Sequence, residues 1–164
     1  MTMTPAEAAV RALLRPTHDS AAWEAGVRAL DRDPALVVLI AILFGAGETQ
    51  HDRAMAATIL GTLGDARALP VLVQALRVAN DPVVRARAGL ALGQLGTAAP
   101  GAEGALVDAL ADPDEFVRES AARVLGSQGA SGESAALARA AQTDPAPASR
   151  QAAARALAQI RGEG

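Results

Sequence analysis

Apolar positions recur along the chain in a unit of 32 or 33 residues, and their spacing within each unit is helical. In each unit an arginine is followed three residues later by alanine, and then by an apolar pair at the sixth and seventh positions. The arginines of the four units are Arg53, Arg85, Arg118 and Arg150. Another apolar segment precedes these helices, most clearly over residues 65–76. The pattern predicts a repeated pair of helices, each with one buried stripe.

Aspartate, proline and glycine mark the expected ends of the helices. Aspartate is a good N-cap and proline suits the first helical position, so each Asp-Pro pair predicts a helix start. The aspartates of these pairs are Asp33, Asp81, Asp112 and Asp144. Glycines suited to left-handed C-caps are Gly64, Gly96 and Gly129. Glycine inside a last turn costs stability, which indicates close approach of a neighbouring helix. The glycines at such positions are Gly61, Gly93 and Gly126.

The repeated arginines fall in the first turns of their helices, where the helix dipole disfavours a cation. An aspartate in the turn before the helix that carries the arginine, with free carbonyls of the preceding helix end, is the expected partner. One such contact per repeat would form a ladder that joins neighbouring turns. Structural repeat positions are therefore assigned to Arg53, Asp81, Arg85, Asp112, Arg118, Asp144 and Arg150. Contact with a ligand is the alternative role for the arginines.

Three segments carry a resemblance to a known repeat. They are residues 69–72 (Leu-Pro-Val-Leu), 81–85 (Asp-Pro-Val-Val-Arg) and 91–96 (Ala-Leu-Gly-Gln-Leu-Gly). They resemble the HEAT-like repeat of the phycobilisome-lyase type, strongly over residues 65–129 and fairly over 33–162. The resemblance implies a right-handed superhelix, with first helices on its convex side and second helices on its concave side. It also implies a scaffold role, as in most members, or a bilin lyase role, as in a minority.

The fold prediction combines this repeat with an alanine-rich composition that lacks alternating strand patterns. We expect an all-α, HEAT/armadillo-like, right-handed α-solenoid of about five antiparallel helix pairs. It would form a single domain over residues 1–164. The predicted units are an N-terminal capping helix pair over 1–32 and repeats over 33–64, 65–96, 97–129 and 130–164.

The most apolar segment, residues 35–44, begins with Ala35, ends with Phe44 and has no polar face. A helix that is apolar all round is expected to be buried on every side, so we expect the N-terminal helices to surround it. The alternative is an exposed apolar patch that forms a homodimer or docks a partner.

A partner-binding surface is predicted on the concave face, at the positions one, two and five residues after each repeat arginine. This face mixes arginine with methionine and leucine, and arginine and methionine are favoured at protein interfaces. The candidate residues are Met55, Thr58, Arg87, Leu90, Glu119, Arg123, Gln151 and Arg155. The alternative is an ordinary solvated face, on which Glu119 and Arg123 form an ion pair along the helix. An acidic or amphipathic peptide segment would suit the mixed surface.

Residues typical of catalysis or of metal and cofactor binding are sparse. The chain has no cysteine, and neither His18 nor His51 stands in a metal-ligand pattern. No glycine-rich phosphate loop is present. A net charge of −3 and 2% aromatic residues argue against nucleic-acid binding. The longest apolar run is ten residues, too short to cross a membrane, and the N-terminus lacks a secretory signal pattern, so we expect a cytoplasmic protein.

The sequence therefore predicts a non-enzymatic protein-protein interaction scaffold or adaptor that binds no cofactor or metal. Its expected partner is a protein or peptide. The main alternative is a bilin lyase-like subunit that binds a tetrapyrrole or its carrier protein, and nucleic-acid binding is a weaker one.

Overall fold

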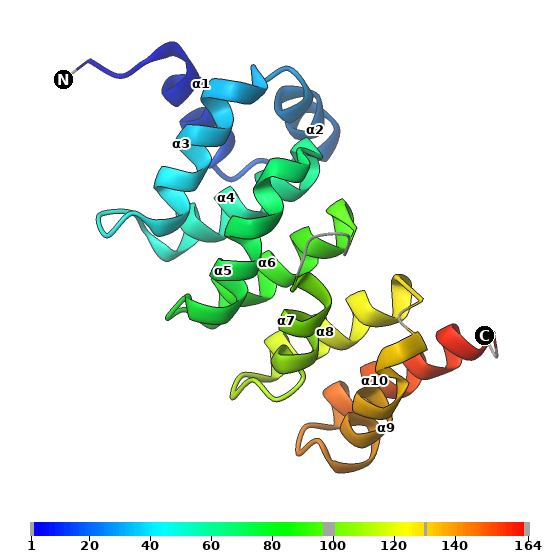
Figure 1. Ribbon diagram of the computed structural model, residues 1–164. Helices are drawn as coiled ribbons and strands as arrows, with labels where there is room; N and C mark the ends of the chain where they lie inside the picture. The colour runs from blue at the N-terminus through cyan, green and yellow to red at the C-terminus, as the bar shows by residue number, and fades with distance from the viewer. Residues whose placement is uncertain (1, 97–100, 130, 163–164) are drawn as a thin grey trace.

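The computed structural model describes residues 2–96, 101–129 and 131–162, and within these ranges the chain folds into ten α-helices without a β-strand. The helices are α1 (Pro5–Leu13), α2 (Ser20–Arg28), α3 (Arg32–Phe44), α4 (Gln50–Leu63), α5 (Leu69–Val78), α6 (Pro82–Leu95), α7 (Ala102–Ala109), α8 (Glu115–Ser127), α9 (Ser134–Thr143) and α10 (Pro147–Arg161). They stack as neighbouring pairs along one axis (Figure 1). The predicted all-α solenoid is confirmed. The repeat boundaries predicted at residues 97 and 130 lie outside the described residues.

The pairs form two layers with the core between them. One layer runs from α1 through α3 and α5 to α7, and the other runs from α4 through α6 and α8 to α10. The predicted apolar stripes face each other across the two layers. Leu72 and Leu106 come from one layer, and Leu60, Leu92 and Leu125 come from the other, and all five are fully buried. Removal of these side chains from water is the main favourable contribution to folding.

Glycine lets the helices of the second layer pack closely, as predicted. A Cβ atom built on Gly93 would lie 2.9 Å from a methyl group of Val124, and one on Gly126 would lie 2.7 Å from the Cα atom of Ala156. Gly61 meets Ala91 in the same way. Each contact joins one repeat to the next, so a larger residue would push adjacent helices apart.

The helix caps follow the prediction only in part. Asp81 is the N-cap of α6 and accepts a hydrogen bond from the N–H of Val83 at 2.8 Å, as predicted. The prediction is wrong for Asp33, Asp112 and Asp144. The N-caps of α3, α8 and α10 are instead Asp31, Asp114 and Ala146. Asp112 and Asp144 accept hydrogen bonds from the N–H groups of those later caps, within the turns before the helices.

The three glycines predicted to end helices all have a positive φ. Gly64 ends α4 in the left-handed conformation at φ 71°, as predicted. Gly96 ends α6 at φ 83° and ψ 155°, so the predicted left-handed cap is wrong there. Gly129, at φ 64°, comes one residue after Gln128, which is the C-cap of α8. Only the positive φ, which glycine tolerates, is common to the three positions.

The apolar helix α3 contacts α1, α4 and α5 but keeps one exposed face. α1 packs against α3, α2 packs against α4, and Leu39 and Ile42 of α3 face the core. On the outer face Val37 is 69% exposed and Phe44 is 41% exposed. The prediction that the N-terminal helices surround residues 35–44 is therefore wrong, because each of these helices covers only its own layer.

Candidate functional site

A groove of about 360 Å³ lies between the first halves of α6 and α8. Residues from α6 and from the start of α8 line it: Pro82, Val83, Ala86, Arg87, Leu90, Asp114, Phe116, Ser120 and Arg123. The structure thus brings three of the predicted surface residues, Arg87, Leu90 and Arg123, into one hollow.

Exposed apolar side chains form part of the groove surface. Phe116 is 64% exposed and Val83 is 43% exposed, and Leu90 between them is half-buried. Phe116 and Val83 were missed from the sequence. A signal for both exists, because each lies seven residues before a predicted groove residue, Arg123 or Leu90, on the same helical face.

Two free guanidinium groups flank this apolar surface. Arg87 and Arg123 are exposed, and within the described part of the chain their side chains form no ion pair or hydrogen bond. The ion pair between Glu119 and Arg123, expected for the alternative of an ordinary solvated face, is therefore not formed. Asp114, which also lines the groove, accepts a hydrogen bond from the N–H of Phe116 at 2.9 Å and so caps α8. The arrangement can bind an acidic group beside an apolar one.

The other predicted surface residues lie outside this groove. Thr58 on α4 is half-buried and donates its hydroxyl hydrogen bond to the carbonyl of Ala54, and Met55 packs partly against the core. Gln151 and Arg155 are exposed on α10, and Glu119 is half-buried on α8. Three of the eight predicted residues therefore line this groove.

Arginine and aspartate join neighbouring turns at two positions, but each aspartate precedes the next helix of the layer and not, as predicted, the helix of the arginine itself. Nε and Nη2 of Arg85 donate to the two carboxylate oxygens of Asp112, each at 2.8 Å. Arg118 binds Asp144 in the same bidentate way, at 2.7 and 3.0 Å. The Nη1 group of Arg85 also donates to the carbonyl of Ala79, in the turn before its own helix. Each arginine thus joins its own turn to the next one, and we call the two pairs the arginine ladder.

Burial and hydrogen bonding oppose each other in the ladder carboxylates. Burial is the largest single influence and by itself would raise the pKa of Asp112, but the hydrogen bonds from Arg85 and from the N–H of Asp114, together with the charges of Arg85 and Arg118, hold that pKa below its ordinary value. The same balance lowers the pKa of Asp144 beside Arg118. Hydrogen bonds to the aspartates raise the pKa values of Arg85 and Arg118 in turn. Both pairs are therefore ionised at neutral pH.

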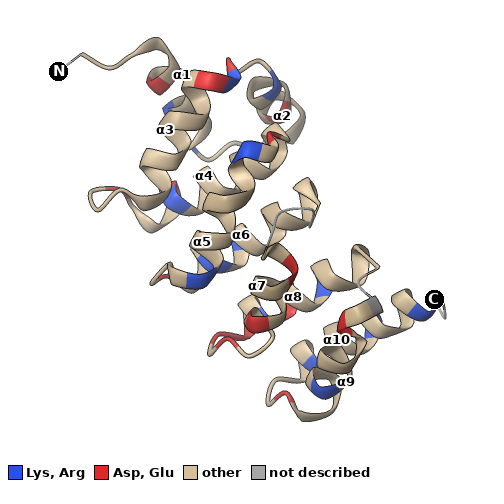
Figure 2. Cartoon of the chain, in the orientation of Figure 1, with Lys and Arg blue, Asp and Glu red and all other residues tan. Residues whose placement is uncertain are grey.

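The ladder does not extend to the other two arginines. Among the described residues Arg53 and Arg150 have no acidic partner, and each uses Nη1 to bind carbonyls of the turn before its helix. Asp81 also stands outside the ladder, because Oδ1 of its carboxylate accepts from Gln50 and from the N–H of Val83. The turns that precede α4, α6, α8 and α10 follow one edge of the solenoid (Figure 1). Figure 2 shows acidic segments at these turns.

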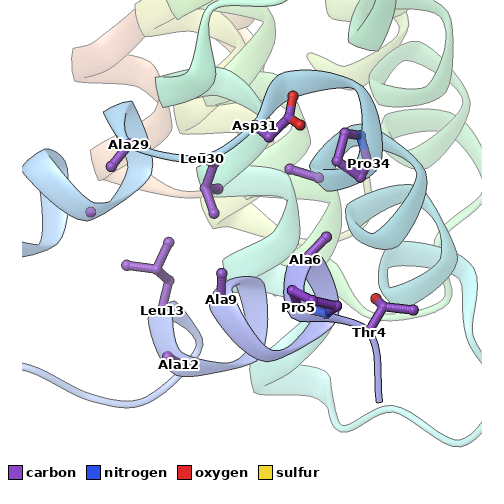
Figure 3. Close-up of a pocket in the computed structure, with 12 residues that line it drawn as sticks. Thr4, Pro5, Ala6, Ala9, Ala12, Leu13, Ala29, Leu30, Asp31 and Pro34 are labelled. Carbon is purple, nitrogen blue, oxygen red and sulfur yellow. The ribbon is translucent and has the colours of Figure 1, made fainter. Parts of the chain in front are cut away.

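A larger hollow, of about 760 Å³, lies between α1, α2 and the start of α3. Figure 3 shows Leu13 and Leu30 pointing toward each other across it. Its lining is almost entirely apolar, and Asp31 is the only ionisable side chain among the lining residues. Such a lining offers no acid–base pair for catalysis.

The part of the chain that the structure describes contains neither a cluster of metal-binding residues nor a helix that could span a membrane. No three His, Asp or Glu residues there are placed to hold a metal ion. Nε2 of His51 lies 2.8 Å from the carbonyl of Leu14, and His18 is exposed in a turn. None of the described helices is both long enough and apolar enough to cross a membrane.

Comparison with known families places the chain among helical repeat proteins. The family described as HEAT repeats matches residues 36–102 and 81–158, and the chain belongs to this family. Among solved structures it is similar to the complex of CpcE and CpcF of phycocyanin lyase from Nostoc sp. PCC7120, with a TM-score of 0.66 and 24% identity. The match covers 99% of this chain and 67% of that one, and it shows a shared fold. No curated protein matches the sequence.

Proposed function

We propose that this chain is a non-enzymatic scaffold that binds a protein partner through the groove between α6 and α8. The observation that carries the proposal is the exposure of Phe116 and Val83 between two arginines without acidic partners. Membership of the HEAT-repeat family supports protein binding in general. Aromatic residues and arginine are also the side chains that most often contribute large shares of interface energy.

The chemistry of the groove favours an acidic, amphipathic segment as its ligand. Burial of an exposed phenylalanine contributes about 1.5–3 kcal/mol. Arg87 and Arg123 would add bidentate hydrogen bonds to carboxylates. A volume of about 360 Å³ admits a few side chains, so a short helix or loop of the partner would enter it.

A pull-down from native lysate tests the proposal. The variant that combines Arg87→Glu with Arg123→Glu should lose the partners retained by the wild type, and Phe116→Ala should weaken them. The control combines Arg139→Glu with Arg155→Glu, two exposed arginines outside the groove, and should retain the partners. Unchanged partners in the groove variants would reject this site.

The similar fold of the phycocyanin lyase structure favours a second candidate, a lyase-like subunit that binds a tetrapyrrole or its carrier protein. In that case Arg87 and Arg123 would face the propionates of the tetrapyrrole. A shift in bilin absorbance on addition of the wild-type protein, absent with the Arg87→Glu and Arg123→Glu variant, would support it. An unchanged bilin spectrum would count against it.

A homodimer through α3 is a separate proposal, supported by the exposed side chains of Val37 and Phe44. Sedimentation velocity over a range of concentrations tests it. The wild type should form a dimer that Val37→Ser with Phe44→Ser abolishes, and a wild type that stays monomeric would reject this interface.

A further inference from the structure

The arginine ladder lacks one aspartate at a position that the fold prepares for it. Asp112 and Asp144 each lie six residues before the arginine of their own repeat, and Ala79 stands six residues before Arg85. Ala79 has φ −63° and ψ 128°, and Asp144 has φ −60° and ψ 133°. Both residues end a helix and donate their N–H group to the carbonyl four residues earlier. Ala79 therefore occupies the ladder position without a carboxylate.

Arg53 is the arginine that this missing carboxylate would bind. Its Nη1 group donates to the carbonyls of Gly45 and Glu48, as Arg85 and Arg118 bind the carbonyls of their own turns. In Arg85 and Arg118 the remaining edge, Nε with Nη2, binds an aspartate. In Arg53 that edge has no acidic partner among the described residues.

A pocket of about 310 Å³ lies beside Ala79, the position at which the ladder aspartate is missing. Arg53, Ala79 and Asn80 line it together with Phe44 and Val78. Val78 is 60% exposed, and it and Phe44 are two of the large apolar side chains that the fold leaves in water. A guanidinium edge and an apolar surface therefore share one pocket at the turns between α3 and α4 and between α5 and α6.

We propose that this pocket binds the C-terminal residue of a peptide whose last side chain is apolar. Its free carboxylate would take the place that Asp112 takes on Arg85, with two parallel hydrogen bonds from Arg53. Its side chain, one carbon away, would cover Phe44 and Val78. An aspartate or glutamate within a chain supplies the carboxylate without that apolar neighbour.

Asp81 also lines the pocket and narrows the choice of anion. Its carboxylate already accepts from Gln50 and from the N–H of Val83, but its charge still repels an incoming anion. The repulsion grows with the charge of the ligand, so a single carboxylate is favoured over a phosphate dianion.

Calorimetric titration with two tetrapeptides tests the proposal. The first is Ala-Ala-Ala-Leu with a free C-terminus, and the second is the same peptide as its C-terminal amide. The wild type should bind the amide at least about tenfold more weakly, because an amide cannot accept two charge-assisted hydrogen bonds. Arg53→Gln should weaken the free acid by a similar factor.

The sharpest variant is Ala79→Asp, which supplies the missing carboxylate from within the chain. It should raise the melting temperature and lower the affinity for the free acid at least about tenfold, since the new carboxylate competes for Arg53. The matched control Ala79→Ser should bind within about twofold of the wild type, because it adds no charge. The proposal is overturned if the wild type fails to bind the free acid, if acid and amide bind alike, or if Ala79→Asp binds like the wild type.

Discussion

The two halves of the solenoid hold their repeats together in different ways. In the N-terminal half, α3 buries Leu36, Leu39, Ile42 and Leu43, and Arg53 has no acidic partner among the described residues. In the C-terminal half, Leu137 is the only buried residue of α9, while Arg118 and Asp144 form a buried ion pair.

The difference shows that a repeated arginine does not by itself make a ladder. Arg53 and Arg118 have the same place in their helices and bind carbonyls in the same way. The residue six positions before the next arginine differs, alanine in one case and aspartate in the other. At α3, where large aliphatic side chains fill the core, the fold tolerates the absence of the arginine–aspartate contact. At α9, where alanine predominates, the Arg118–Asp144 pair joins the turns.

The largest loss of stability is expected for Arg118→Ala, which leaves the carboxylate of Asp144 buried without its arginine partner. Loss of one member of a buried pair costs about 3 kcal/mol or more. Arg53→Ala removes only hydrogen bonds to carbonyls and should cost about 1 kcal/mol. Urea unfolding of both variants measures the difference, and equal losses would contradict the contrast between the halves.

The next effect is expected at the close contact between α8 and α10. Gly126→Ala places a Cβ atom against the backbone of Ala156 and should cost roughly 1–3 kcal/mol. Gly104→Ala serves as control on the exposed face of α7, where a Cβ atom meets nothing within 4 Å. It should stabilise the protein by about 0.5–1 kcal/mol. Destabilisation by both variants would refute close packing as the cause.

A smaller effect, an increase in stability, is expected for Ala79→Asp, which adds the missing contact to the N-terminal half. Charge-assisted hydrogen bonds to Arg53 should raise the free energy of unfolding by about 1 kcal/mol at neutral pH. Combination with Arg53→Gln should remove the gain, which makes a double-mutant cycle by urea unfolding the measurement. A gain that survives in the double variant would show that the new carboxylate acts through another group.

The smallest expected effect is a dependence of the protein's stability on pH. The pKa values of Asp112 and Asp144 are lower in the folded chain than their ordinary value of 3.8. Their contribution to stability is therefore complete above pH 3.8 and is lost as pH falls through the lower folded values. In Asp112→Asn the acid loss of stability, followed by circular dichroism, should be smaller than in the wild type. An unchanged acid profile would contradict this role of Asp112.

Periodicity in the sequence was enough to predict the core and the close contacts between repeats. Leu92 and Leu125 are buried as the helical spacing requires, and Gly93 and Gly126 meet neighbouring helices. Prediction failed where a choice depended on residues far along the chain. Asp112 was predicted as an N-cap, but Asp114 supplies the cap, while Arg85, 27 residues before Asp112, binds its carboxylate.

The candidate groove was predicted only in part, because it too depends on residues that are far apart along the chain. Arg87 and Arg123 were identified from their places in the repeat, and the structure brings both into the groove. Phe116 was missed because it precedes the repeat arginine, although it shares a helical face with Arg123. The exposure of Val37 on α3 agrees with the alternative of an exposed apolar patch, but the sequence could not decide between the two alternatives, because it does not state how many neighbours a helix has.

Photo-crosslinking in cells tests most directly whether the groove between α6 and α8 binds a partner. A photoreactive benzoylphenylalanine at position 116 replaces a side chain of similar shape in the groove, and the same residue at position 155 on α10 serves as control. We expect a discrete crosslinked protein from position 116 and not from position 155. No adduct from position 116, or the same adduct from both positions, would contradict it.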